Sequence, residues 1–302
     1  MQSALDSVVC QNEKNLEIIA VDDGSVDRTS DILESYTRKI QLKIIRLPHT
    51  GNWTANTNIG FSSAQGEYIS FLHQDDIWLP NRFRILKEMA EKEPDSVLFL
   101  HQSYFIDING KKLGIWKSPF PDNQQPLSSE FILSRLLVQN FISIPAPCFK
   151  RKAAVQAGLL DECLWYTADW KLWIRLALIG KWVYYPYPLT GFRIHPTSLT
   201  AKGSENLTEF RHQIQTILDQ FLPELSAYPA INTERIKQIA DFSMSVNTML
   251  AAIAWRQPFH ITPFLKECYK LGVPGLCQYI EYSRITERVS ARIKAGLTTL
   301  LI

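Results

Sequence analysis

Short apolar runs alternate with amphipathic helical patterns over residues 16–100, and this alternation constrains the fold more than any other feature of the sequence. The apolar runs predict strands at 16–21, 42–47, 68–72 and 96–100, with helices between them at 26–39, 53–64 and 79–93. Strands and helices that alternate at this spacing are typical of βαβ units. We therefore expect an α/β fold, with a mostly parallel sheet flanked by helices.

The second part of the chain follows a different pattern. Residues 105–127 are rich in Pro, Gly, Asn and Lys, which favours turns or a hairpin, and helices are predicted at 128–139, 150–157 and 168–180. From about residue 204 the pattern is helical throughout, with breaks expected at Pro223, Pro229, Pro258, Pro263 and Pro274. The sequence thus predicts an α/β domain at residues 1–200 and a helical C-terminal region at residues 201–302.

Composition excludes several classes of protein. Lys and Arg total 32 against 30 Asp and Glu, so the net charge of +2 gives no electrostatic basis for a nucleic-acid partner. No stretch reaches the roughly 18 apolar residues of a membrane span, and the N-terminus lacks the pattern of a signal peptide. The five cysteines form no C-x-x-C pair, which favours reduced thiols and a cytoplasmic location.

Two of the predicted strands run directly into pairs of carboxylates. Asp22-Asp23-Gly24-Ser25 follows the first strand, and His73-Gln74-Asp75-Asp76 follows the third. In open parallel sheets the carboxyl ends of the strands form the ligand site, and clustered carboxylates are costly unless a cation lies between them. Mg²⁺ or Mn²⁺ suits oxygen ligands better than zinc does. The alternative for the first pair is turn and helix-cap chemistry, with Ser25 or Asp27 as the cap.

Three segments together resemble family 2 glycosyltransferases with the GT-A fold: LEIIAVDDGSVDRT, GNWTANTNIGFSSAQGEYISFLHQDDIWLPNRF and YTADWKLWIRLA. The resemblance covers roughly residues 3–198. It implies an inverting, metal-assisted enzyme that moves a sugar from a nucleotide-diphosphate sugar, a UDP-sugar above all, to an acceptor hydroxyl. The acceptor would be a saccharide or lipid-linked, in the synthesis of a polysaccharide, glycan or glycolipid.

The resemblance also implies roles for single residues on the donor side. The second Asp of the first motif contacts the nucleotide base, which is Asp23 here, with Asp22 beside it. The segment Asn58-Ile59-Gly60 corresponds to the part of the family that lines the nucleotide site. In the later acidic pair, Asp75 faces the ribose and Asp76 binds Mn²⁺ or Mg²⁺ together with the diphosphate.

Two further positions complete the implied site. Ala168-Asp169-Trp170 matches the family's catalytic-base motif, so Asp169 is the candidate base, although the family's preceding Glu is absent. The stripe of Leu172, Trp173, Leu176 and Ile179 places Asp169 in the first turn of a helix, whose positive end favours the ionised carboxylate. The alternative for Asp169 is helix capping or compensation of the helix dipole. His195, in Arg193-Ile194-His195, is implied to contact the metal or a phosphate.

The start of the chain departs from the family pattern. The sequence begins inside what resembles the family's first helix, near residues 4–8, without the strand that precedes it and lines the nucleotide pocket. We interpret the sequence as truncated, or its true start as lying upstream, and expect unpaired strand edges and apolar surface. A non-catalytic nucleotide- or glycan-binding protein derived from the same fold is therefore the alternative function. A sugar-1-phosphate nucleotidyltransferase would need a Gly-rich N-terminal loop and a phosphate-binding lysine, which the sequence lacks.

Two local patterns leave alternatives open. The stretch 285–302 is amphipathic and basic, so it either lies on a membrane surface as a peripheral contact or packs against the main domain or a second subunit. Trp165 and Tyr166 precede the helix of Asp169 and either contact an acceptor sugar or pack locally. Trp173 and Trp182 are predicted to be core residues.

Overall fold

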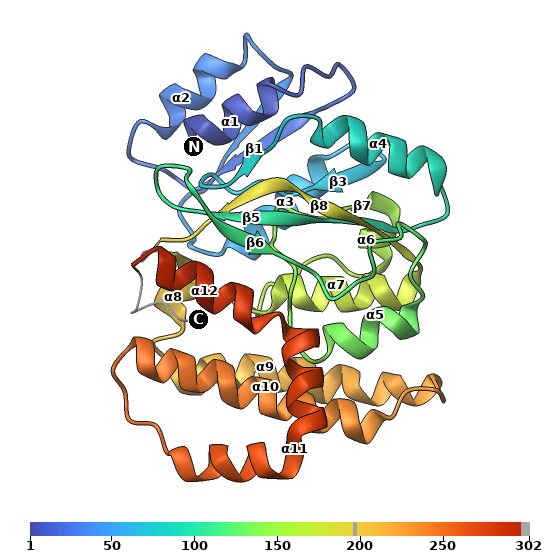
Figure 1. The fold of residues 1–302 in the computed structure, drawn as a ribbon. Helices are drawn as coiled ribbons and strands as arrows, with labels where there is room; N and C mark the ends of the chain where they lie inside the picture. The colour runs from blue at the N-terminus through green and yellow to red at the C-terminus, as the bar shows by residue number, and fades with distance from the viewer. Residues whose placement is uncertain (196–197, 297–302) are drawn as a thin grey trace.

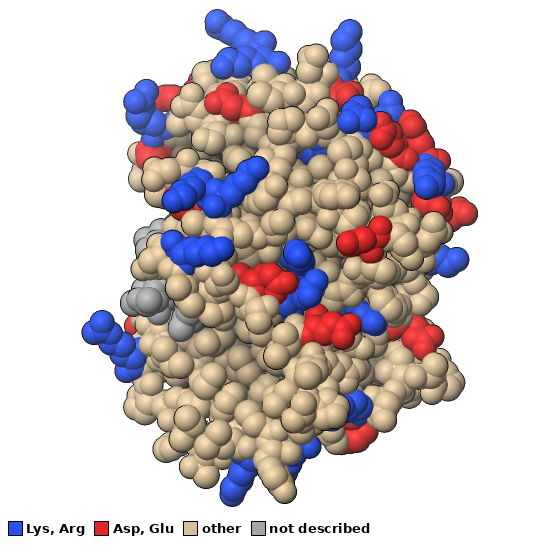
Figure 2. Space-filling view, viewed as in Figure 1, with Lys and Arg blue, Asp and Glu red and all other residues tan. Residues whose placement is uncertain are grey.

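The computed structural model describes residues 1–195 and 198–296. Its sheets lie across the middle of the molecule, with α1 (Gln2–Val9), α2 (Thr29–Tyr36) and α4 (Arg82–Lys92) on one side and the C-terminal helices on the other (Figure 1). Lys and Arg are interspersed with Asp and Glu on the face shown in Figure 2.

The first sheet contains two parallel strands, β1 (Ile18–Asp22) and β2 (Leu42–Arg46). Helix α2 connects them, so this unit is the predicted βαβ element. Its helices bury an apolar cluster of their own, which centres on Leu5, Leu33 and Tyr36. The Tyr36 hydroxyl donates to the Asp6 carboxylate and thereby joins α2 to α1.

The second sheet has six strands. Their order is β3 (Tyr68–Ser70), β7 (Cys148–Lys150), β5 (Leu98–Ile106), β8 (Trp182–Arg193) and β4 (Ile77–Trp78), with β6 (Lys112–Trp116) paired to β5. The expected α/β fold is confirmed, but the expectation of mostly parallel pairing is wrong in detail. Within the described residues only β1·β2 and β5·β8 are parallel. One reason is that β6 returns from β5 through a tight turn, in which Gly110 has a φ of +83°.

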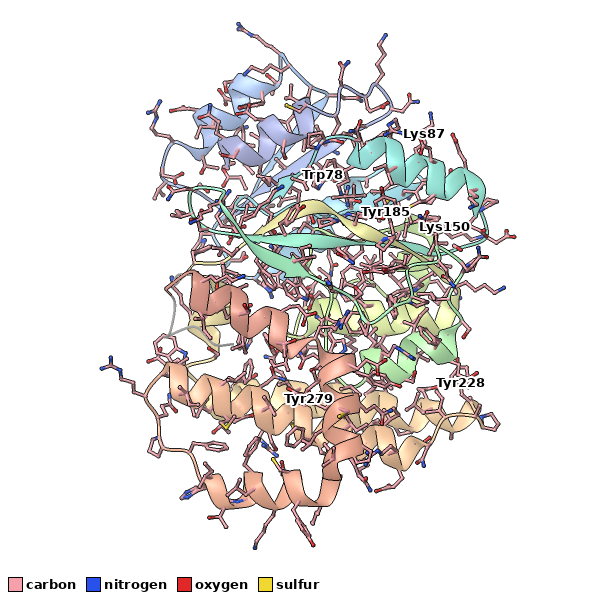
Figure 3. All side chains as sticks on the ribbon, in the orientation of Figure 1. Trp78, Lys87, Lys150, Tyr185, Tyr228 and Tyr279 are labelled. Atoms are coloured by element: carbon pink, nitrogen blue, oxygen red, sulfur yellow. The ribbon has the colours of Figure 1, made fainter. Side chains whose placement is uncertain are left out.

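The two sheets are divided between β1 and β3. In the part of the chain that the structure describes, β1 pairs only with β2 and β3 only with β7. A cavity lies between them, and its walls include side chains of both strands and of α1 and α4. The expected unpaired strand edges are therefore present among the described residues, and they face this cavity. Trp78, labelled in Figure 3, lies on this wall beneath the Arg82 guanidinium, 4.4 Å from its ring centre.

Most of the predicted helices are present. Side-chain caps begin several of them: Asn52 accepts from the backbone of α3, and Ser128, Asn206 and Asn232 do the same for later helices. Helices end or begin beside Pro223, Pro229 and Pro258, as expected, and near Pro274 the helix Ile261–Ser283 has a kink at Gly272. Pro263 breaks nothing, because it lies in the first turn of that helix. The remaining helices are α3 (Trp53–Ser63), α5 (Ser129–Leu136), α6 (Arg151–Gln156), α7 (Ala168–Ile179), α8 (Leu199–Gly203), α9 (Leu207–Phe221), η1 (Leu222–Ala227), α10 (Thr233–Ala254), α11 (Ile261–Ser283) and α12 (Ile285–Lys294).

The helical region shares one core with the sheet region. A continuous apolar cluster includes Phe61 of α3, Trp173 of α7 and Tyr279 of α11. At the centre of the junction the buried Gln139 side chain accepts from the Ser243 hydroxyl at 2.9 Å and from the Asn247 amide at 2.6 Å. The domain boundary near residue 200 stays a prediction, since these contacts cross it.

The basic C-terminal stretch packs onto the sheet region in its described part. Helix α12 lies along β6, and one face of it is buried. This is the packing interpretation of residues 285–302, of which 297–302 lie outside the described residues. Among the helices that the structure describes, none combines the length and the apolar character needed to cross a bilayer.

We predict that Gln139→Ala weakens the whole molecule. The Ser243 and Asn247 donors would lose a buried acceptor, which costs about 1–3 kcal/mol of unfolding free energy. Urea unfolding followed by tryptophan fluorescence and by circular dichroism should shift in one common transition, since the core is shared. Gln238→Ala, an exposed change on the same helix α10, is the control. Two separate transitions would show that the regions unfold independently.

Candidate active site

One cavity of about 1610 Å³ collects most of the residues that the sequence singled out. It runs from the gap between β1 and β3, past the loops that follow β1, β3 and β8, to the start of α7. Segments far apart in the sequence therefore contribute carboxylates to one space. Of the predicted site residues, the cavity is lined by Asp22, Asp23, Asp75, Asp76, Asp169 and His195, but not by Asn58.

Asp23 fastens the loop after β2. Its Oδ1 accepts from the Thr50 backbone N–H at 2.9 Å, and its Oδ2 accepts from the Gly51 N–H at 2.8 Å. The bond from Thr50 is the largest influence on Asp23, and with the other donors it lowers the pKa to about 2. The carboxylate is thus ionised at any physiological pH and faces the cavity at the carboxyl end of β1.

Asp22 and Asn58 have structural partners. Asp22 is buried, and its Oδ1 accepts from the Ser25 N–H at 3.0 Å, which is the turn chemistry that the sequence left open. The Asn58 amide donates to the Leu160 carbonyl and accepts from the Leu160 N–H, so it joins α3 to the loop before α7. Its neighbour on the helix, Asn56, lines the cavity instead.

Asp76 is a buried carboxylate with one unsatisfied oxygen. Its Oδ1 accepts from the Arg193 backbone N–H at 2.8 Å, whereas Oδ2 has no partner among the described residues. Burial, reinforced by the charge of Asp75, raises the pKa of Asp76 well above its usual value. The Arg193 side chain also donates to the Asp75 carbonyl at 2.7 Å, so the end of β8 fixes this acidic turn.

The atoms around Asp76 suit a divalent cation. Ligand atoms of His73, Asp75 and Asp76 all lie within 4.8 Å of one another. His195, the sequence-predicted ligand, pairs with Asp75 instead, with its Nε2 2.8 Å from Oδ2. A buried carboxylate oxygen without a partner, next to a second carboxylate, fits Mg²⁺ or Mn²⁺. The sequence analysis did not predict His73 as a ligand, although it stands two residues before Asp75 in the loop after β3.

Asp169 occupies the first turn of α7, as predicted. Its Oδ1 accepts from the Trp170 N–H at 2.7 Å, and its Oδ2 accepts from the Asn140 side-chain amide at 3.2 Å. Burial raises the pKa of Asp169 to about 6, which outweighs the hydrogen bonds that lower it. The backbone N–H groups at the start of the helix favour the ionised carboxylate, as expected, but burial has the larger effect. Asn140 was missed because nothing in the sequence connects it to a residue 29 positions later.

The aromatic residues around Asp169 fall into two groups, core residues and residues that line the cavity. Trp173 and Trp182 are fully buried, which confirms them as core residues. Trp165 and Tyr166 line the cavity, and both also pack locally: the Trp165 ring lies against Gly203, and the Tyr166 ring lies 4.6 Å from that of Phe210.

Comparisons with known proteins agree on one family. The family model "Glycosyl transferase family 2" matches residues 1–151. A Rickettsia typhi protein described as an uncharacterized glycosyltransferase is 31% identical over 214 residues, which are 70% of this chain and 64% of that protein. The Escherichia coli UDP-Glc:alpha-D-GlcNAc-diphosphoundecaprenol beta-1,3-glucosyltransferase WfaP is 29% identical over 150 residues, 47% of this chain and 58% of WfaP. The chain thus spans less than two thirds of the length of either relative.

A solved structure shows the same fold. S. aureus TarS 1-349 in complex with UDP-GlcNAc aligns with a TM-score of 0.59 over 99% of this chain and 85% of that chain. The identity is 14%, so the likeness concerns the fold alone. It supports the GT-A-like arrangement, with a mixed α/β core and a helical C-terminal region.

We predict that Asp76→Asn has opposite effects on the melting temperature, relative to the wild type, with and without metal. In EDTA at pH 7.5 the variant should melt at a higher temperature than the wild type, because it removes a carboxylate whose ionisation is disfavoured by burial. This advantage should shrink as pH falls toward about 4, where the unfolded chain also binds the proton. Added Mn²⁺ should raise the melting temperature of the wild type only. An equal Mn²⁺ response in the variant would remove Asp76 from the metal site, and exposed Asp122→Asn is the control.

Proposed function

We propose that this chain, which belongs to glycosyltransferase family 2, transfers a sugar from a nucleotide-diphosphate sugar to an acceptor hydroxyl, with inversion at the anomeric carbon. The observation that carries the proposal is the single cavity to which Asp23, the Asp75-Asp76 pair and Asp169 all contribute. Carboxylates at these places provide for a nucleotide, a metal-bound diphosphate and a base, which are the three requirements of the reaction.

The donor would occupy the carboxyl ends of β1 and β3. A UDP-sugar is favoured, because WfaP is named for UDP-Glc and the TarS structure contains UDP-GlcNAc. Asp23 would contact the base and Asp75 the ribose, with Asn56 rather than Asn58 on the cavity wall. Asp76 would hold Mn²⁺ or Mg²⁺, with His73 and His195 as its histidine neighbours. Such an ion would offset the negative charge that develops on the leaving diphosphate.

Asp169 would act as the base. Its carboxylate accepts the proton of the acceptor hydroxyl while that oxygen bonds to the anomeric carbon and the bond from this carbon to the diphosphate breaks. A pKa of about 6 suits this role, since the group is ionised at neutral pH but still binds a proton readily. The Asn140 amide and the Trp170 N–H would hold the carboxylate in place. They would give the support for Asp169 that the Glu of the family motif, absent here, does not provide.

The acceptor is proposed to be a saccharide or a lipid-linked saccharide. WfaP is named for an acceptor with a diphosphoundecaprenol group, which is consistent with polysaccharide or glycolipid synthesis at the cytoplasmic face of a membrane. A cytoplasmic location is part of the proposal, because the five cysteines form no C-x-x-C pair in the sequence. Trp165 and Tyr166 are the aromatic candidates for an acceptor sugar ring.

A non-catalytic nucleotide- or glycan-binding role is the second candidate. The observation that favours it is the division of the sheet between β1 and β3, which opens the cavity beside Asp23. Such a protein would bind the nucleotide without turning over the donor.

The deciding experiment combines binding with turnover. Thermal shifts with UDP, GDP, TDP and CDP, each with and without Mn²⁺, identify the donor class, and Asp76→Ala is the control. Ligand at about 100 times its dissociation constant should stabilise the folded chain by roughly 2.7 kcal/mol. Release of the nucleotide diphosphate from the matching sugar donor then tests transfer. Binding without turnover in the wild type would select the second candidate, and full turnover by Asp169→Asn would remove Asp169 from its role.

We predict that activity falls as pH drops through about 6, because protonated Asp169 cannot accept a proton. Asn140→Ala removes a hydrogen bond that lowers this pKa, so the acidic limb of kcat/KM should move upward by about 0.5–1 pH unit. Activity at pH 8.5 should change much less. The exposed Asn109→Ala is the control, and an acidic limb at the same pH in all three proteins would contradict the assignment.

A further inference from the structure

Helix α12 directs two arginines into the cavity. Arg288 and Arg292 stand four residues apart, so they share one face of the helix, and only 5% and 8% of their surfaces are exposed. Both line the same cavity as Asp169. The helix lies along β6, and it appears in red beside β6 in Figure 1. Ala291 between them packs with Phe105 and Leu113, which fixes the orientation of this face.

Neither arginine has a counter-charge in residues 1–195 and 198–296. The structure shows no carboxylate paired with either side chain there, and Nε and Nη1 of Arg288 have no hydrogen-bond partner. The hydrogen bond found for the Arg292 side chain runs from Nη1 to the Arg288 carbonyl, at 3.2 Å. The nearest acidic residue on the helix, Glu287, lies 3.7 Å from Arg284 instead.

This arrangement is unfavourable without a ligand. A buried cation loses its hydration, and like charges at this helical spacing repel each other. Burial, followed by the charge of Arg288, lowers the pKa of Arg292 to about 9. The Phe105 ring, 6.0 Å from the Arg292 guanidinium carbon, offers a weak cation–π contact but no negative charge. An anion is therefore what this pair of arginines lacks to balance its charge.

The position of the pair places this anion beside the candidate base. The charges of Asp169, Arg288 and Arg292 all influence the pKa of Tyr166, so the three charged groups lie near the same phenol. The pair also adjoins Ile194, the residue next to His195, through the cluster of Ala291. The arginines thus line the same cavity as Asp169 and the end of β8, and they lie near both.

We propose that Arg288 and Arg292 bind a phosphate or diphosphate group of a substrate. Guanidinium groups match the oxygens of a phosphate in a bidentate way, and the unpartnered Nε and Nη1 of Arg288 provide two adjacent donors for it. The assignment to a substrate rests on the proposed function. The phosphate belongs either to the acceptor, on the Asp169 side, or to the donor diphosphate, on the His195 side.

Inorganic pyrophosphate is the probe. Calorimetry in EDTA measures its affinity for the full chain without the metal site, and UDP with Mn²⁺ measures the donor site separately. Arg288→Gln and Arg292→Gln should each weaken pyrophosphate binding by roughly tenfold or more. Lys294→Gln removes a charge from the exposed side of the same helix and should leave it unchanged. Arg288→Lys and Arg292→Lys retain the positive charge, so they are expected to fold. They lose only the bidentate geometry of the guanidinium group.

The outcomes distinguish the acceptor from the donor as the source of the phosphate. They also distinguish a failure of this subsite from a failure of the proposed sugar transfer. Loss of pyrophosphate affinity with unchanged UDP affinity assigns the site to the acceptor, and an equal loss of both assigns it to the donor diphosphate. The subsite stands in either case, even where no sugar transfer is found. If the wild type does not bind pyrophosphate, or if the arginine variants bind it as tightly as Lys294→Gln does, the proposal is wrong even where transfer is found. A structural role predicts a lower melting temperature for the Gln variants in phosphate-free buffer, whereas a ligand site predicts an equal or higher one.

Discussion

The parallel pairing of β5 with β8 is the constraint on which the rest of the structure depends. It runs from Leu98 opposite Trp182 to Ile106 opposite Arg193, through strands that are buried along most of their length. β7 and β6 attach to β5, and β4 attaches to β8. The pairing ends at Arg193, whose backbone and side chain fix the Asp75-Asp76 turn. The acidic site is thus positioned by a strand more than a hundred residues away in the sequence.

Charges of both signs are held in the same cavity, at different places. Asp76 and Asp169 are carboxylates whose pKa values are raised by burial, and Arg288 and Arg292 are cations without a counter-charge among the described residues. None of these groups neutralises another directly, as ion pairs in a rigid core do. Unpaired charges in a partly dehydrated space interact strongly with whatever enters it. These are the features that the proposed substrates would need, since the donor is anionic and the acceptor hydroxyl loses a proton.

The sequence predicted what local pattern determines. The strands β1, β2 and β3 and the helices between them follow from hydrophobic periodicity, and Asp169 in the first turn of α7 follows from the apolar stripe behind it. β8 was missed because Pro186, Pro188 and Gly191 interrupt it, residues that normally argue against a central strand. The sheet tolerates them through shifts of register beside Gln102.

The missed site residues share one property: their partners are distant in the sequence. Asn140 meets Asp169 through a loop, and α12 reaches the cavity only because the helical region folds back onto β6. Their residue types alone carry no signal, since Asn is common in loops and Arg is common on helix surfaces. At Asn58 the family resemblance predicted a residue of the nucleotide site. The Asn58 side chain instead forms hydrogen bonds with the backbone of Leu160.

The divided sheet has a consequence for local unfolding. The β1–β2 unit has its own small apolar cluster and meets the larger sheet across a cavity rather than through backbone hydrogen bonds. Its amide protons are therefore expected to exchange with solvent through openings that leave the main core intact. The carboxylate that would hold the nucleotide base, Asp23, stands on this unit. Occupation of the site would then appear as slower amide exchange in the first fifty residues, before any change elsewhere in the molecule.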